Sequence, residues 1–184
     1  MRTIITGGLL ACLLGNAPLQ AEPYPDRPIT IVVPFGKGTT ADLIAAVVSD
    51  AVSKNIGQKI TVELKPGAGG GGAMEQVEKA APDGYTLAMI TQGTHVFNLG
   101  LYNALRYDPR KIIPITPIGT PPEIVQRLRD EFAKAAAEPA VKAKLNAAGL
   151  DPIDQMQPAE FAGLISSDLA TWTPIIKTAG ARAE

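Results

Sequence analysis

The chain has 184 residues, of which 46% are hydrophobic, and its 17 basic and 18 acidic residues give a formal net charge of -1. This length supports one domain with a substantial core and is short for a protein of two lobes. The basic residues are spread along the chain, so neither a nucleic-acid partner nor an anionic membrane surface has electrostatic support. We therefore expect one compact lobe.

The first residues have the pattern of a secretory signal peptide. Arg2 provides a cationic start, residues 4–14 are almost wholly apolar, and small residues precede Ala21. This apolar stretch is too short to span a bilayer, so we expect an exported, periplasmic protein whose leader, residues 1–21, is cleaved near Ala21. The only cysteine, Cys12, lies inside the leader, so the mature chain would have no disulfide and no cysteine metal site.

The first part of the mature chain alternates between strand and helix patterns. β-Branched or apolar runs at 29–33, 60–64 and 85–90 predict strands. Apolar residues at helical spacing over 43–56 predict a helix after the first strand, and a shorter helix is expected over 73–81. This alternation indicates an α/β fold with a parallel sheet covered by helices.

Helical patterns take over in the last third of the chain. Thr120 is the expected N-cap of a helix whose buried stripe begins at Ile124. A second short helix is expected over 139–148. A third is marked by apolar positions over 161–172, and Pro174 is expected to kink or break it.

The first candidate binding loop contains Phe35, Gly38, Thr39 and Asp42 and joins the first strand to a helix. Free amides and the positive end of the helix dipole meet at such a position, so a carboxylate or phosphate can be held without a cationic side chain. The spacing of Thr39 and Asp42 is also that of a capping box, in which Asp42 would serve only the helix. The residues leave both roles open.

The second candidate loop, Gly67–Gly72, matches the pattern G-x-G-x-x-G between a strand and a helix, as a Rossmann-like dinucleotide site requires. The acidic residue expected about 20 positions further on is replaced by Thr91 and Gln92. No Lys-Ser or Lys-Thr follows the glycines, which excludes a P-loop. The alternatives are a dinucleotide site and a turn whose backbone approaches a ligand or a neighbouring strand closely.

The third candidate loop contains Thr91, Gly93, Thr94 and the only histidine, His95. His95 has no cysteine or glutamate partner at a metal-binding spacing, and no catalytic motif is present, so we expect no metal, no cofactor and no enzymatic activity. All three loops follow predicted parallel strands and fall at the same edge of the sheet, where ligands bind in open α/β folds.

Several motifs in order resemble the tripartite tricarboxylate transporter receptors, also called the Bug family of extracytoplasmic solute receptors. The resemblance to the amino-terminal half of that family rests on Pro25-x-Arg27-Pro28, Ile31–Phe35, Lys65–Gly70, Ala81–Leu87, Gly93–His95 and Tyr107–Pro109, and residues 119–180 resemble its carboxyl-terminal helices. In the family a second α/β domain stands between these parts. The resemblance implies that about 100 to 150 residues are excised near 118–120, leaving 22–184 as domain one with a nearly complete core.

The resemblance also implies a function. The family that the chain resembles captures a small carboxylate between two lobes of a periplasmic binding protein and delivers it to a membrane transporter of one large and one small subunit. By resemblance, this lobe's half of the cleft is lined by Phe35, Gly38, Thr39, Asp42, Ala68, Gly69, Gly70, Thr91, Gly93, Thr94 and His95. We expect a monomer. The alternatives are a vestigial fragment that binds nothing and a dinucleotide-binding fragment.

Overall fold

The computed structural model describes residues 24–112, 121–151 and 156–183. The predicted leader with its cysteine, the cleavage site at Ala21 and the predicted junction at 118–120 lie outside these ranges. Within them, no helix is both long enough and apolar enough to cross a membrane.

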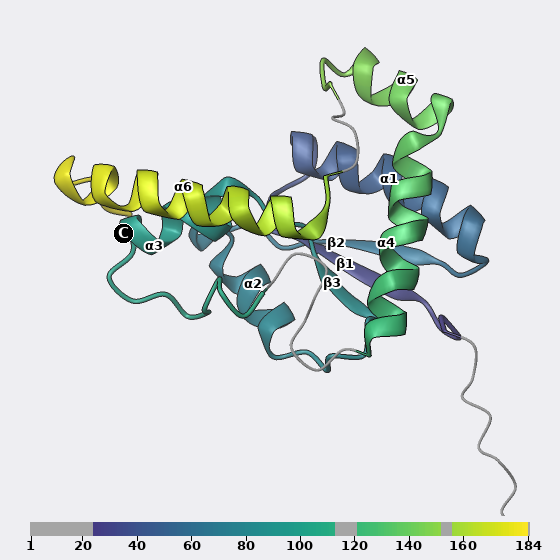
Figure 1. The fold of residues 1–184 in the computed structure, drawn as a ribbon, viewed down its shortest axis with the longest axis horizontal. Helices are drawn as coiled ribbons and strands as arrows, with labels where there is room; N and C mark the ends of the chain where they lie inside the picture. The colour runs from purple at the N-terminus through teal and green to yellow at the C-terminus, as the bar shows by residue number, and fades with distance from the viewer. Residues whose placement is uncertain (1–23, 113–120, 152–155, 184) are drawn as a thin grey trace, which may run out of the picture.

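The centre of the fold is a parallel sheet of β1 (Ile29–Val33), β2 (Ile60–Leu64) and β3 (Thr86–Ala88) in the order β2-β1-β3. The predicted parallel sheet is confirmed (Figure 1). The first two strands have the predicted bounds, whereas β3 is shorter than the predicted 85–90. Among the described residues β3 pairs only with β1, which ends at Val33, so its ladder stops at the same level.

Helices cover both faces of the sheet. One core cluster joins the odd-numbered residues of β1 to α1 (Thr40–Ile56), α4 (Pro122–Ala137) and α5 (Pro139–Ala147). On the opposite face, Val32 packs with Ala73 and Met74 of α2 (Gly71–Glu78). Because successive side chains of a strand point to opposite faces, β1 is buried from both sides and reads as a continuous apolar run.

Three helix starts differ from the prediction. α2 begins at Gly71 and ends at Glu78, whereas the sequence predicts a helix over 73–81. α1 begins at Thr40, earlier than the predicted 43, because Thr39 is its N-cap. α4 begins at Pro122 with Pro121 in the N-cap position, so the expected cap by Thr120 is wrong by one residue, and Thr120 itself lies outside the described residues. A proline at the first helical position lacks only an N–H that would have no partner there.

The last helix, α6 (Pro158–Thr178), continues through Pro174 without the expected break. Pro174 and Ala170, whose carbonyl loses its usual partner, are both exposed, so water can replace the missing hydrogen bond. Contacts before and after the proline also hold the helix straight: the Trp172 ring packs edge-on against Phe97 at 5.5 Å, and Ile176 packs against Gly100.

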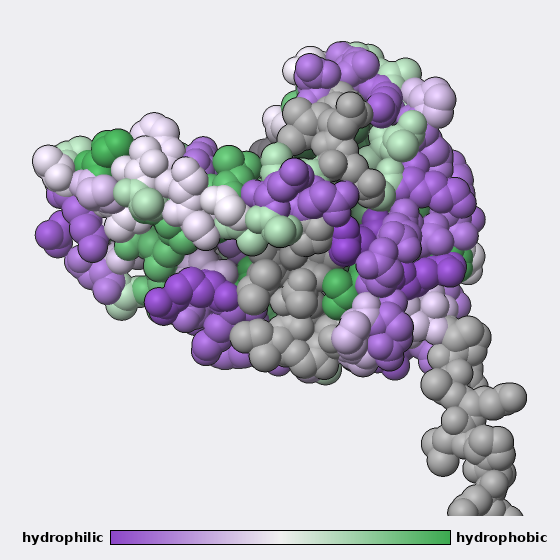
Figure 2. All heavy atoms as spheres, viewed as in Figure 1, coloured by the Kyte–Doolittle hydropathy of each residue, from purple (hydrophilic) through white to green (hydrophobic). Residues whose placement is uncertain are grey.

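α6 lies across two short helical segments, η2 (Gly93–Phe97), which includes the end of the third loop, and α3 (Asn98–Leu101), which follows it (Figure 1). α6 also carries exposed apolar side chains, and green areas are visible along it in Figure 2. The largest of these side chains are Leu164, Trp172 and Ile175. α6 therefore covers η2 and α3, although none of its side chains with a described burial is buried.

Candidate functional site

The three candidate loops meet at Gly70. A Cβ atom placed on Gly70 would lie 2.6 Å from Cβ of Pro34 in the first loop and 2.9 Å from Cγ2 of Thr94 in the third. Only glycine allows this approach, because both distances are shorter than a van der Waals contact. The parallel strands thus bring the loops to one edge of the sheet, as predicted.

In the first loop, Thr39 caps α1 as the spacing predicts, whereas the Asp42 carboxylate bonds the amide one residue before the N-cap. Thr39 Oγ1 accepts a hydrogen bond from the Asp42 amide at 3.3 Å and donates one to the carbonyl oxygen of Gly36 at 2.9 Å. Oδ2 of Asp42 accepts a hydrogen bond from the Gly38 amide at 2.8 Å. The Asp42 carboxylate therefore occupies a position that an anionic ligand would otherwise take.

The first turn of α1 still offers donors. Thr40 and Ala41 stand at its first two positions, where the helix itself cannot pair the amide N–H groups. Thr40 and the neighbouring Gly38 are exposed, whereas Ala41 is 8% exposed and its side chain belongs to the core cluster. Phe35, in contrast, is partly buried and packs against the core cluster. A carboxylate at this helix start would be bound by backbone amides.

The second loop has an unusual run of left-handed backbone angles. Gly67, Gly69 and Gly70 have φ values of 115°, 58° and 83°, and Ala68 has a φ of 45°. The side-chain Nδ2 of Asn98 donates a hydrogen bond to the carbonyl oxygen of Gly69 at 2.9 Å. Ala68 and Gly69 remain exposed, while Gly70 is buried. The glycines therefore serve backbone conformation and close packing.

The third loop is held by two threonines. The Thr91 amide donates to Thr94 Oγ1 at 3.0 Å, and that hydroxyl donates to the Thr91 carbonyl oxygen at 3.1 Å. Thr91 and Gly93 are partly exposed, but Thr94 has an exposed fraction of 0%. The structure thus places Thr94 beneath the surface of the predicted site.

His95 is also buried, with 4% of its surface exposed. Its Nε2 lies 2.6 Å from the carbonyl oxygen of Ile112, so Nε2 carries the proton and donates. Nδ1 has no hydrogen-bond partner among the described residues. Burial lowers the pKa of His95, because the imidazolium would lose its hydration. His95 therefore supports the third loop from below as a neutral ring.

Sequence reasoning missed the residues that tie the second and third loops together. Nδ2 of Asn98 also donates to Oη of Tyr107 at 3.0 Å, and that hydroxyl donates to the carbonyl oxygen of Thr94 at 2.6 Å. Oη of Tyr102 would lie 2.7 Å from a Cβ on Gly69. The spacing of Asn98 and Tyr102 on one helical turn was the available signal, although it does not identify their partners.

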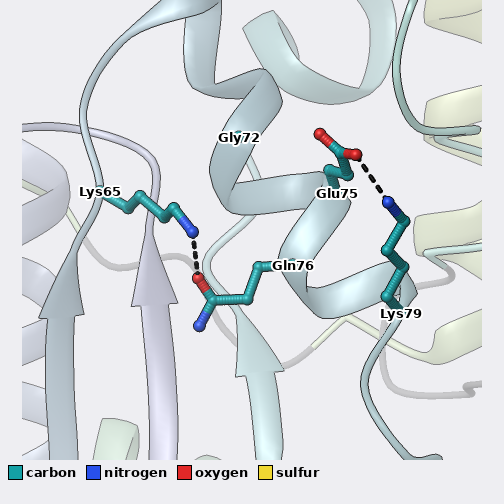
Figure 3. Close-up of a pocket in the computed structure, with 5 residues that line it drawn as sticks. All are labelled: Lys65, Gly72, Glu75, Gln76 and Lys79. Carbon is teal, nitrogen blue, oxygen red and sulfur yellow. Dashed lines mark hydrogen bonds and ion pairs between the residues drawn. The ribbon is translucent and has the colours of Figure 1, made fainter.

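A shallow hollow of about 340 Å³ lies beside α2, where the second loop enters the helix at Gly72 (Figure 3). Its charged groups are already engaged. Lys65 Nζ donates to Gln76 at 2.7 Å, and Lys79 Nζ lies 2.7 Å from Glu75 (Figure 3). It therefore has little capacity to bind an anion. Among the described residues, no group of three or more His, Cys, Asp or Glu side chains could hold a metal ion.

The model of the tripartite tricarboxylate transporter family receptor, TctC, matches residues 44–118 and 111–181. The chain belongs to this family. TctC proteins are receptors and not enzymes, so the family does not support the alternative of a dinucleotide-binding enzyme fragment.

Relatives in the family are considerably longer than this chain. A UPF0065 protein of Bordetella pertussis is 34% identical over 116 residues, which cover 63% of this chain and 36% of the relative. A UPF0065 protein from the tcbD-tcbE intergenic region of Pseudomonas sp. is 33% identical over 158 residues, which cover 81% of this chain and 47% of the relative. The chain thus spans about a third to a half of the length of the curated relatives it matches.

Solved structures show the same fold at low sequence identity. A periplasmic transporter superimposes with a TM-score of 0.80 at 19% identity, over 86% of this chain and 99% of its own. MatC from Rhodopseudomonas palustris with bound malate superimposes with a TM-score of 0.77 at 19% identity, over 83% of this chain and 100% of its own. An R. palustris protein with adipate superimposes with a TM-score of 0.77 at 18% identity, over 87% of this chain and 100% of its own. The lobe is therefore a periplasmic-binding-protein fold.

Proposed function

We propose that this chain is the first lobe of an extracytoplasmic solute-binding component and that its three loops bind the carboxylate of a small organic acid. The observation that carries the proposal is the convergence of the loops around Gly70, together with the first-turn amides of α1, which the helix itself does not pair. The malate and adipate present in neighbouring structures support the carboxylate class.

Within the predicted site, we propose two roles. Phe35, Gly38, Thr39, Ala68, Gly69, Thr91 and Gly93, which are exposed or partly exposed, form the surface that the ligand meets. Asp42, Gly70, Thr94 and His95 hold that surface in place through the contacts described above. The ligand carboxylate is bound by the amides of Thr40 and Ala41, and no cationic side chain is required.

We also propose that domain two is absent, with a junction near 118–120, so that 22–184 is domain one. Two observations support this: the family match consists of two stretches that overlap at 111–118, and the relatives are at least twice as long as their matched parts. Export to the periplasm after cleavage near Ala21, and delivery to membrane transporter subunits, are supported by the leader pattern and by the family.

The test is a titration of the ¹⁵N-labelled mature chain with malate, adipate and NAD, followed by NMR. We expect either acid to shift the amide resonances of Thr40 and Ala41, and NAD to shift none in Gly67–Gly72. The variant Thr40→Pro removes one donor at a position where proline is tolerated, and it should weaken binding about two- to tenfold.

The matched control, Thr40→Ala, keeps the backbone amide and should bind as the wild type does. If neither acid shifts any resonance of the three loops, the chain is the vestigial fragment that the missing lobe would leave. Shifts confined to Gly67–Gly72 on addition of NAD would instead establish a dinucleotide site.

A further inference from the structure

One edge of β3 has no partner strand in the described parts of the chain. The Thr30 amide donates to the Tyr85 carbonyl at 2.8 Å, and the Met89 amide donates to the Val32 carbonyl at 2.9 Å. In a parallel ladder alternate residues face the same neighbour, so the odd-numbered residues of this segment bond β1. The backbone N–H and C=O groups of Thr86 and Ala88 therefore point away from β1, towards the free edge of the sheet.

A cavity of about 800 Å³ runs along this edge. One wall comes from α1 and α4, and the other comes from α2 and the turn after it. The apolar side chains of the walls include Ile44, Val48, Leu128, Phe132 and Val77. In the described parts of the chain, the core is therefore open beside β3.

The groove contains polar groups that need a partner. Ser49 lines it, is 3% exposed, and has an Oγ atom with no hydrogen-bond partner. The outward N–H and C=O groups of Thr86 and Ala88 lie in the same groove. Both residues are only partly exposed, and any molecule that displaces water from the groove must pair these groups. An apolar small molecule would fill the volume but would leave these backbone groups unpaired.

A β-strand can both fill the apolar volume and pair with the outward backbone groups of β3. Its backbone can pair with β3, and apolar side chains on its two faces can pack against the two helical walls, as in a buried parallel sheet. A second copy of this chain fits less well, because its own β3 edge lies between the same helices, which would collide before the two edges met. The groove therefore favours a strand with both edges free.

The chain itself marks the position of this strand. The described structure stops at Ile112, which lines the groove, and resumes at Pro121 before α4, whose Val125 also lines it. The two family matches overlap at 111–118, so the extra sequence of the longer relatives is expected to enter and leave here. The intervening residues of this chain include Pro114 and Pro117, which have no N–H to donate to a ladder.

We propose that this groove binds an apolar β-strand of a second polypeptide, which adds to the free edge of β3. This inference concerns a surface other than the carboxylate loops and does not depend on their ligand. It explains how a chain that spans about half of its relatives or less can complete its core: the missing strand is supplied by another molecule.

The probe is a fluorescent peptide that carries the sequence of β1, Ile-Thr-Ile-Val-Val, between lysine pairs for solubility. We expect its anisotropy to rise on titration with the mature chain. The variant Ala88→Pro removes only an outward N–H, because the bonds to β1 come from the neighbouring residues. It should weaken peptide binding about tenfold, which corresponds to about 1.4 kcal/mol.

Val62→Pro is the matched control, because its N–H points outward from β2, the opposite edge strand, away from the groove. It should bind the peptide as the wild type does. A peptide with proline at its first and fourth strand positions should not bind. The proposal is overturned if dodecanoate binds and the peptide does not, if Ala88→Pro binds normally, or if sedimentation shows a dimer that excludes the peptide.

Discussion

The side-chain amide of Asn98 donates a hydrogen bond to the carbonyl oxygen of Gly69 across 2.9 Å, which fixes the second loop to the segment after the third. Asn98 is only 3% exposed and also contacts Tyr107. We expect Asn98→Ala to lower the free energy of unfolding by about 1 to 3 kcal/mol, because it removes the hydrogen bonds to the Gly69 carbonyl and to the buried Tyr107 hydroxyl. Urea unfolding measures this loss.

Asn103 provides the control for that measurement, since it is exposed and lies on the same stretch of chain. Asn103→Ala should change the free energy of unfolding by less than about 0.5 kcal/mol. Equal effects of the two substitutions would show that the Asn98 contacts do not hold the glycine loop.

Gly70 is the second position at which the site depends on one contact. Gly70→Ala would place a Cβ 2.6 Å from Pro34 at a φ of 83°, so both overpacking and the left-handed backbone oppose it. We expect a loss of about 2 to 4 kcal/mol, measured by thermal unfolding with circular dichroism. Gly36→Ala, where no atom lies within 4 Å of the new Cβ, should be close to neutral.

These two contacts show what the sequence could and could not predict. The β-branched runs of β1 and β2 define their strands almost alone, and parallel strands place the three loops at one edge. The reason for Gly70, however, lies in Pro34 and Thr94, which are distant in sequence, and no local pattern reveals such a contact.

The same limit applies to the third loop and to β3. Thr94 and His95 follow a strand and look like surface loop residues, yet the turn of η2 directs both inward. The open edge of β3 was equally hidden, because the sequence shows that a strand exists but not how many neighbours it has. Tertiary packing decides both features.

His95 predicts a specific pH dependence. Burial lowers the pKa of His95 in the folded state, whereas in the unfolded chain the His95 imidazole has its ordinary pKa of about 6.5. The unfolded state therefore takes up the proton first, so stability is fully present above about pH 6.5 and falls as the pH drops towards the folded-state pKa. Urea midpoints between pH 8 and pH 5 measure this fall.

The variant His95→Gln tests the assignment, because its side-chain amide can still donate to the Ile112 carbonyl but does not titrate in this range. The fall in midpoint between pH 8 and pH 5 should be smaller in this variant than in the wild type. An identical fall in both proteins would assign the pH dependence to other groups.

The last prediction concerns the strength of carboxylate binding. The Gly38 amide is already bonded to Asp42, which leaves the first-turn amides of Thr40 and Ala41 as the main donors at α1. A contact with an exposed helix N-terminus contributes about 0.3 to 1 kcal/mol, and without an opposing lobe water competes for the same groups. We therefore expect dissociation constants no better than about millimolar for malate or adipate, corresponding to about -4 kcal/mol. Titration calorimetry on the monomer decides the matter: micromolar binding would mean that the site is complete without a second lobe, and the proposed loss of domain two would not have impaired it.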